Sequence, residues 1–251
     1  MKKLIVVLAH PRTGSSLLMQ TLRFLNVGIL GRFEREDLPQ QANPKGYYED
    51  REILGKGLTD WAIERIEQDH NEILAVKIAL TGMMRDDRSH QWQYLRKKRA
   101  TILVTIRPPL ESAVSRMVFT NLPDEITRFK LITTFLRNYQ LQYKALSKKL
   151  LTEVTELLPK TFTINYHTAQ HIPDKYIQSI IDSAGLTVSK SQVKDAINNI
   201  DPKLYRYNQD SFENNVKEWH RKIGSESYYN ILSTQKNPWQ IINDSPLYGT
   251  S

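Results

Sequence analysis

The chain has 251 residues, a formal net charge of +8 at neutral pH and no cysteine. The lack of cysteine excludes disulfides, thiolate metal sites and a cysteine nucleophile, and it is typical of a reducing compartment, so we expect a cytoplasmic protein. Hydrophobic residues make up 40% of the chain and charged residues 25%, which argues against a disordered chain. The 35 lysines and arginines against 27 acidic residues favour a polyanionic partner, although a merely soluble surface gives the same balance.

Four short apolar runs predict strands that are buried on both faces of a parallel sheet. They lie at residues 4–9, 73–80, 101–106 and 161–166. The first run follows two lysines, as in a signal peptide, but it is only six residues long and no cleavage site follows it, so we expect a strand there. No apolar stretch approaches the roughly 20 residues of a membrane helix, and we expect no membrane-spanning segment.

Amphipathic patterns between and after these runs predict helices. They cover residues 15–25, 50–67, 92–98, 110–119, 124–151, 175–183 and 189–199. This order of strands and helices predicts an α/β fold in which helices flank a central parallel sheet. We find no repeat or linker and expect one domain over residues 1–251. Ligands of such folds bind at the carboxyl ends of strands, so the loops after the predicted strands are where a site is expected.

The loop after the first predicted strand has the composition of a phosphate cradle. Gly14 permits a close backbone approach, and the amides at the start of the following helix attract anions. Arg12 adds a fork-shaped cation, while Thr13, Ser15 and Ser16 add hydroxyl groups. A Walker A loop would need an earlier glycine and a lysine before the hydroxyl, which disfavours a magnesium nucleoside triphosphate. An ordinary capped turn between strand and helix is the alternative.

A second pair of residues follows the predicted strand at residues 101–106. Arg107 comes directly after this strand, and Ser115 lies eight residues later on the next helix. An arginine at a strand end and a serine on the neighbouring helix can bind one phosphate together. Taken alone, the pair also fits a surface arginine and a serine with no role.

Residues 11–17 and the Arg107/Ser115 pair together resemble the two nucleotide motifs of the sulfotransferases. These enzymes use 3′-phosphoadenosine 5′-phosphosulfate (PAPS). The first motif of the family binds the 5′-phosphosulfate, and its second, an Arg followed by a Ser at this spacing, binds the 3′-phosphate. The resemblance implies a P-loop-like three-layer fold. It also implies transfer of a sulfuryl group to a hydroxyl or amine of a small-molecule, carbohydrate or lipid acceptor, with adenosine 3′,5′-bisphosphate (PAP) as product. Arg12 would then stabilise the leaving group, and no metal is expected.

Further site residues follow from the same resemblance. Tyr166, at the end of a predicted strand, corresponds to a tyrosine that contacts the adenine. Arg221 and Lys222 are similar to a late loop that closes over the 3′-phosphate, although Ile223 interrupts the family's Arg-Lys-Gly pattern.

The general base is the point at which the sequence departs from the cytosolic members of the family. Those members place a His two residues after a strand-end Lys, whereas Ala79 follows Lys77 at that spacing here. Other branches use a Glu between the first helix and the next strand. We therefore expect Glu49, from a segment similar to one in bacterial members, or else Glu34, to act as the base.

Three other interpretations compete with this one. A P-loop-like kinase or phosphotransferase would use a related cradle, but the Walker lysine is missing. A catalytically inactive nucleotide-binding relative fits the missing His. A nucleic-acid-binding protein would need clustered basic residues with interleaved aromatics, whereas residues 97–99 and 148–149 form short runs on predicted helices, so we expect no nucleic acid partner. His167 and His171 have helical metal-ligand spacing but no acidic partner, and we expect no metal there.

Overall fold

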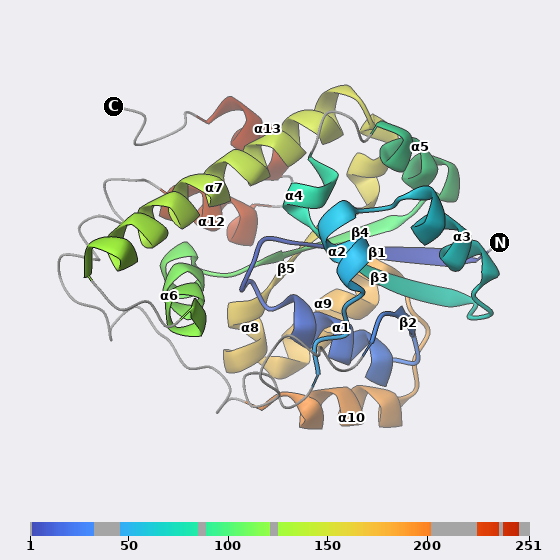
Figure 1. Cartoon of the computed structure of the whole chain (residues 1–251). Coiled ribbons are helices and arrows are strands. Elements are labelled where there is room, and N and C mark those ends of the chain that lie inside the picture. Colours follow the sequence, from blue (N-terminus) through green and yellow to red (C-terminus); the bar gives the residue numbers. More distant parts are fainter. Residues whose placement is uncertain are drawn as a thin grey trace.

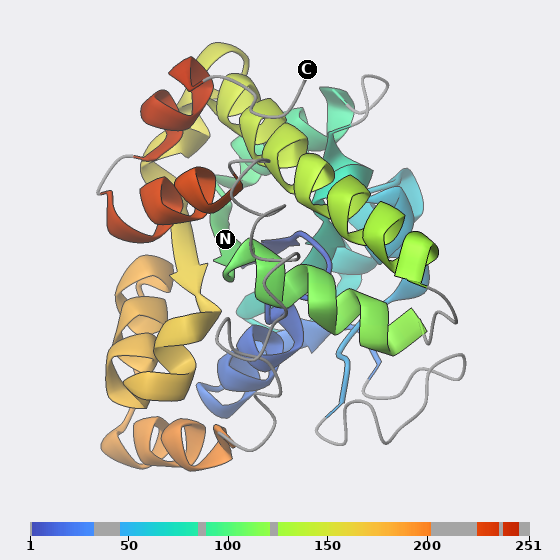
Figure 2. The same ribbon diagram turned by 90° about the vertical axis from the view of Figure 1, so that its left-hand side faces the viewer.

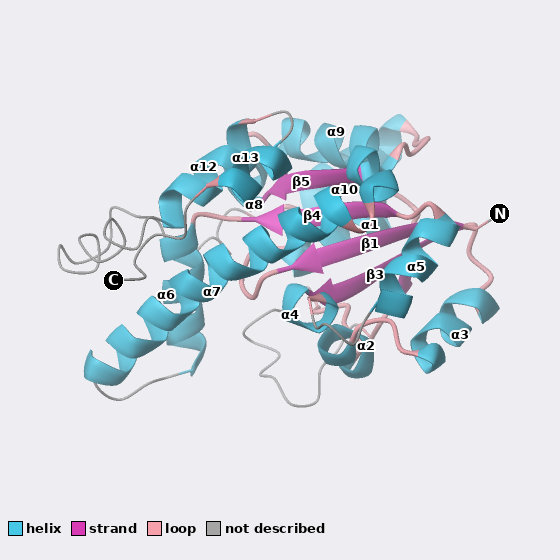
Figure 3. Cartoon of the chain, turned by 90° about the horizontal axis from the view of Figure 1, so that it is seen from above, coloured by secondary structure: helices cyan, strands magenta, loops and turns pink. Residues whose placement is uncertain are grey.

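The structure, a computed structural model, describes residues 2–32, 46–84, 89–120, 125–201, 225–235 and 238–245. Within these residues, parallel strands form one sheet in the order β2-β3-β1-β4-β5 (Figure 1). The strands are β1 (Lys3–Ala9), β2 (Gly28–Leu30), β3 (Ile73–Ala79), β4 (Thr101–Ile106) and β5 (Thr161–Asn165). Figure 3 shows the arrows of β1, β3, β4 and β5 pointing toward the same edge of the sheet.

Helices cover both faces of this sheet, which confirms the predicted three-layer α/β fold. One face carries α1 (Ser15–Phe24), α8 (Tyr166–His171), α9 (Pro173–Ala184) and α10 (Lys190–Asn199). The other carries α2 (Arg51–Lys56), α3 (Asp60–Gln68), α4 (Leu80–Met83), α5 (Ser89–Lys98), α7 (Glu125–Thr152), η3 (Thr155–Lys160), α12 (Ser225–Thr234) and α13 (Pro238–Asp244). Helix α6 (Pro109–Thr120) lies beyond the strand ends, in front of the sheet in Figure 2.

The side chains of β1 explain why its sequence is apolar without a break. Leu4, Val6 and Leu8 pack into the core under α7, while Ile5 and Val7 pack into the core against α1 and α9. Successive side chains of a strand point to opposite faces, so a strand covered on both sides needs apolar residues at every position.

The strand order brings two distant loops together. From β1 the chain continues to β2 and β3 on one side of the sheet and then crosses to β4 on the other side of β1. Strands β1 and β4 pair directly, with Ala9 opposite Thr105. The loops that leave their carboxyl ends therefore start side by side, at the switch point where ligands of open α/β sheets bind.

At three places the difference from the sequence prediction has a local physical cause. Strand β2 has only three residues and includes Gly28, so it carries too short a pattern to be recognised. The helix predicted over residues 50–67 is two helices, because Gly57 adopts a left-handed φ of 73° and the Thr59 side chain caps α3. Tyr166 begins α8 rather than ending β5, since the Asn165 side chain accepts a hydrogen bond from the His167 amide and starts the helix.

Among the described residues, no helix combines the length and the apolar character that crossing a membrane requires.

Candidate functional site

The loop between β1 and α1 is a tight turn fastened to β4. Arg12 and Gly14 both have left-handed φ angles, of 66° and 92°. The buried Thr13 hydroxyl donates to the His10 carbonyl over 2.7 Å and shares a 2.6 Å hydrogen bond with the Thr105 hydroxyl. Gly14 is the N-cap of α1, and no side chain caps the first turn of that helix. Amides at such a helix start are suited to bind an anion.

Tyr166 packs directly on Gly14. A Cβ atom built at position 14 would lie 2.2 Å from Cδ2 of Tyr166, so the ring occupies the space that any other side chain would need. On the same ring, the Cζ atom of Arg107 lies 4.9 Å from the centroid, within the range of a cation–π contact. Tyr166 thus contacts both the loop after β1 and the arginine after β4.

The two predicted motifs meet at Arg12. Its Nε donates a 3.1 Å hydrogen bond to the Ser115 hydroxyl, and its carbonyl accepts from the Ser112 hydroxyl at 3.4 Å. Burial lowers the pKa of the Arg12 guanidinium, and the nearby positive charge of Arg107 lowers it further. Arg107 is 5% exposed, and its Nε donates to the Glu111 carboxylate at 3.2 Å. The structure therefore joins Arg12, Arg107 and Ser115 in one positively charged site.

A buried ion pair borders the first turn of α1. The Lys77 ammonium lies 2.6 Å from Oε1 of Glu49 and donates to the Tyr47 carbonyl at 2.7 Å and the Ser16 hydroxyl at 3.2 Å. The side chain of Lys77 is fully buried and that of Glu49 is 10% exposed. The backbone of Glu49 is held by two hydrogen bonds with that of Arg32. Lys77 thus connects the candidate base to the cradle loop.

Sequence reasoning singled out Lys77 and Glu49 separately and missed their pairing. A lysine inside the apolar sequence of β3 was the available signal, because a buried cation requires an anionic partner. The identity of that partner depends on how the segment around Glu49 folds back over β3, and no local pattern records this.

The sequence analysis also assigned no residue of α7 to the site, although this helix contacts it. His10 is 2% exposed and packs edge-on against Phe135, with ring centroids 4.5 Å apart. Tyr139 donates to the Arg107 carbonyl at 3.3 Å, and Tyr143 donates to the Thr105 carbonyl at 2.7 Å. Aromatic residues of one helix thereby support the loops after both β1 and β4. The helical spacing of these aromatic residues predicts a buried face of α7 but not a contact with the two loops.

The remaining candidates are placed as follows. Ser15 begins α1 and is partly buried. Glu34, Arg221 and Lys222 lie outside the described residues. His167 and His171 lie next to each other on α8, with ring centroids 4.2 Å apart and the rings tilted by 44°, and within the described parts of the chain they belong to no cluster of three metal-ligating residues.

No protein-family model and no curated protein matches this sequence. Among solved structures, mouse sulfotransferase SULT7A1 complexed with PAP aligns with a TM-score of 0.57 and 12% identity, covering 96% of this chain and 87% of that one. The sulfotransferase domain of the Synechococcus PCC 7002 olefin synthase aligns at 0.46 with 13% identity, over 88% of this chain and 95% of that one. The sulfotransferase domain of the curacin biosynthetic pathway aligns at 0.45 with 15% identity, over 91% and 98%. The chain thus shares the fold of the mouse sulfotransferase.

The contact between Gly14 and Tyr166 predicts that Gly14→Ala destabilises the fold. The new methyl group meets the ring at 2.2 Å in a left-handed residue, so we expect urea denaturation to show a loss of more than about 1 kcal/mol. The matched control is Gly55→Ala on α2, where an added Cβ meets nothing within 4 Å and we expect a neutral or slightly stabilising effect. Equal stabilities of Gly14→Ala and the parent chain would contradict the packing described here.

The buried His10 predicts a pH-dependent stability. Burial lowers its pKa from 6.5 to about 3, so below pH 6.5 the unfolded chain binds a proton that the folded chain excludes. The contribution of neutral His10 to the free energy of unfolding is therefore fully present above pH 6.5. Below that pH it decreases by up to about 1.4 kcal/mol per pH unit. Urea denaturation at pH 7 and pH 5 measures the loss. His10→Phe, which keeps the aromatic contact, is expected to lose about 2 kcal/mol less over this interval. Identical losses in the two proteins would show that His10 does not titrate in this way.

Proposed function

We propose that the protein is a PAPS-dependent sulfotransferase that transfers a sulfuryl group to a hydroxyl or amine of its acceptor. The observation that carries the proposal is the 3.1 Å hydrogen bond from Arg12 to Ser115. It joins the loop suited to a 5′-phosphosulfate to the pair suited to a 3′-phosphate. The fold shared with mouse SULT7A1, whose structure is a complex with PAP, supports the same function.

In this proposal the 5′-phosphosulfate lies over the start of α1. The amides from Gly14 onward and the hydroxyls of Ser15 and Ser16 bind its oxygens. Because the Thr13 hydroxyl is engaged with His10 and Thr105, Thr13 braces the loop and contributes its backbone amide.

The 3′-phosphate is bound by Arg107 and Ser115, and Tyr166 supplies an aromatic face for the adenine. Glu111 orients the Arg107 guanidinium by accepting a hydrogen bond from its Nε. The positive charges of Arg107 and Arg116 both act on Arg12, and this concentration of guanidiniums favours a ligand with several negative charges.

The transfer step itself needs charge stabilisation and a proton acceptor. As the acceptor oxygen bonds to sulfur, the bond from sulfur to the oxygen of the 5′-phosphate breaks and negative charge builds on that oxygen. Arg12 stabilises this charge and, as a permanent cation, donates no proton. Glu49 receives the proton of the acceptor, and Lys77 holds that carboxylate beside Ser16.

Arg107→Ala is expected to weaken PAP binding by about 2–3 kcal/mol, the cost of a lost charged hydrogen-bonding group. Its affinity for adenosine 5′-monophosphate, which lacks the 3′-phosphate, should stay unchanged, and calorimetry with both ligands measures the difference. Lys194→Ala, an exposed charge on α10, is the control and should bind both as the parent chain does. The proposal would be wrong if Arg107→Ala preferred PAP over adenosine 5′-monophosphate as strongly as the parent chain does. It would also be wrong if the parent chain bound ATP–magnesium instead of PAP.

Glu49→Gln is expected to lower kcat by about 10²–10⁴-fold, because the amide cannot accept the proton. The affinity for PAP should be retained, since Glu49 is not assigned to the nucleotide. The measurement follows transfer from radiolabelled PAPS to an acceptor found by screening, with Glu64→Gln, an exposed carboxylate on α3, as the matched control. Full activity of Glu49→Gln together with loss in Glu34→Gln would assign the base to Glu34.

A further inference from the structure

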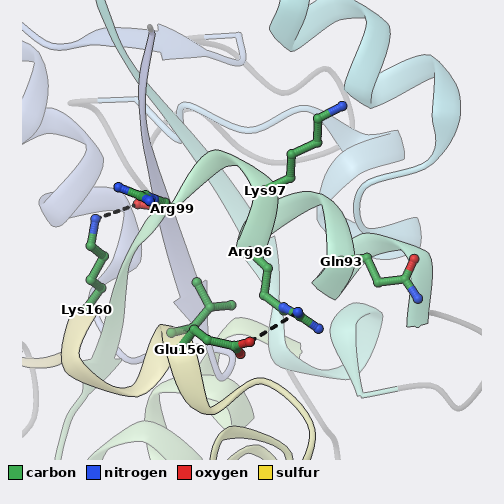
Figure 4. Close-up of a pocket in the computed structure, with 7 residues that line it drawn as sticks. Gln93, Arg96, Lys97, Arg99, Glu156 and Lys160 are labelled. Atoms are coloured by element: carbon green, nitrogen blue, oxygen red, sulfur yellow. Dashed lines mark hydrogen bonds and ion pairs between the residues drawn. The ribbon is translucent and has the colours of Figure 1, made fainter.

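A second basic site lies at the opposite edge of the sheet. Here a cavity of about 700 Å³ is lined by Arg96 and Lys97 from the last turn of α5, by Arg99 after it, and by Glu156 and Lys160 from η3 (Figure 4). Gln93 and Leu157 also line it, so four of its seven lining residues are cationic. The volume is in the range of small-molecule sites and exceeds what one phosphate fills.

The cavity is separate from the site around Arg12. One residue, Ala100, separates Arg99 from β4, and Lys160 immediately precedes β5, so the cavity lies where these strands begin. Arg107 and Tyr166 lie where the same two strands end. The six residues of β4 span about 20 Å, and no residue belongs to both sites.

The charges of the cavity are only partly neutralised. Arg96 pairs with Glu156 at 3.1 Å, whereas in the described parts of the chain no carboxylate forms an ion pair with Lys97, Arg99 or Lys160. Lys160 donates instead to the Arg99 carbonyl at 3.1 Å, which fixes its ammonium beside that residue. Figure 4 shows Arg99 and Lys160 next to each other, with Lys97 extending away from the Arg96–Glu156 pair. Like charges held in this way favour a bound anion.

The backbone of Arg99 gives an independent indication. Arg99 closes α5 with a left-handed φ of 49°, and its amide donates to the Arg96 carbonyl at 2.9 Å. Glycine is the residue that such a helix end favours, because a side chain is strained there. Local conformation therefore does not by itself favour an arginine at this position.

We propose that this amino-edge cavity binds a small organic polyanion that carries two or more phosphate or sulfate groups. Arg99 and Lys160 bind one group, and the guanidinium of Arg96 binds another. The inference does not depend on the proposed sulfotransferase activity, because it uses none of the residues assigned to that activity.

Calorimetry on the full chain tests this inference, with inositol hexakisphosphate as the phosphate-ester probe and sucrose octasulfate as the sulfate-ester probe. Arg99→Gly removes the charge and relieves the strained φ. We expect it to bind the preferred probe about tenfold more weakly, the effect of one lost charged contact, while its stability to urea is unchanged or higher. Lys160→Met should weaken binding to a similar degree. The probe that binds the parent chain more tightly identifies the ester class.

Two controls make the test decisive. Lys194→Met removes an exposed cation on α10 and should change affinity by less than about twofold, because distant surface charges are screened. An equal loss in this variant would mean that the probes sense only net charge. The proposal is also overturned if Arg99→Gly and Lys160→Met bind as the parent chain does. Loss of the probe in Arg107→Ala, with retention in Arg99→Gly, would place the probe at the other edge of the sheet and reject the cavity.

Discussion

The proximity of two arginines, Arg12 and Arg107, is the constraint on which the candidate site depends. Each follows a different strand, and burial together with the charge of Arg107 lowers the pKa of Arg12. Burying two cations close together costs free energy through their repulsion and their loss of hydration, unless other groups compensate for both. Glu111, the Ser115 hydroxyl and the ring of Tyr166 are those groups here. They hold the two guanidiniums in place, and of the three only Glu111 carries a negative charge.

Hydrogen bonds at the end of β4 link the parts of this arrangement. The Thr105 hydroxyl bonds to Thr13 of the cradle loop, and its carbonyl accepts from Tyr143 of α7. One strand residue therefore fastens the loop after β1 to the long helix that also supports Arg107 through Tyr139. The aromatic residues of α7, which belong to neither sequence motif, are part of the site for this reason.

The sequence predicted what depends on local pattern and left out what depends on packing. The apolar runs of β1, β3, β4 and β5 identified the sheet because strands covered on both faces need apolar residues at every position. The edge strand β2 is too short to carry such a pattern, and the break at Gly57 depends on a backbone angle that composition does not specify. Within the site, the spacing of Arg107 and Ser115 along the chain was enough to single out this pair from the sequence. The pairing of Lys77 with Glu49 was not, because it arises only when the chain before α2 folds over β3.

The protonation states around the cradle narrow the chemistry that the proposed function allows. His10 adjoins the loop, yet burial lowers its pKa to about 3, so it stays neutral near pH 7 and is too weak a base to take a proton from an acceptor. Arg12 keeps its charge, since a guanidinium does not deprotonate in this range. Neither residue at the start of the loop therefore moves a proton during turnover.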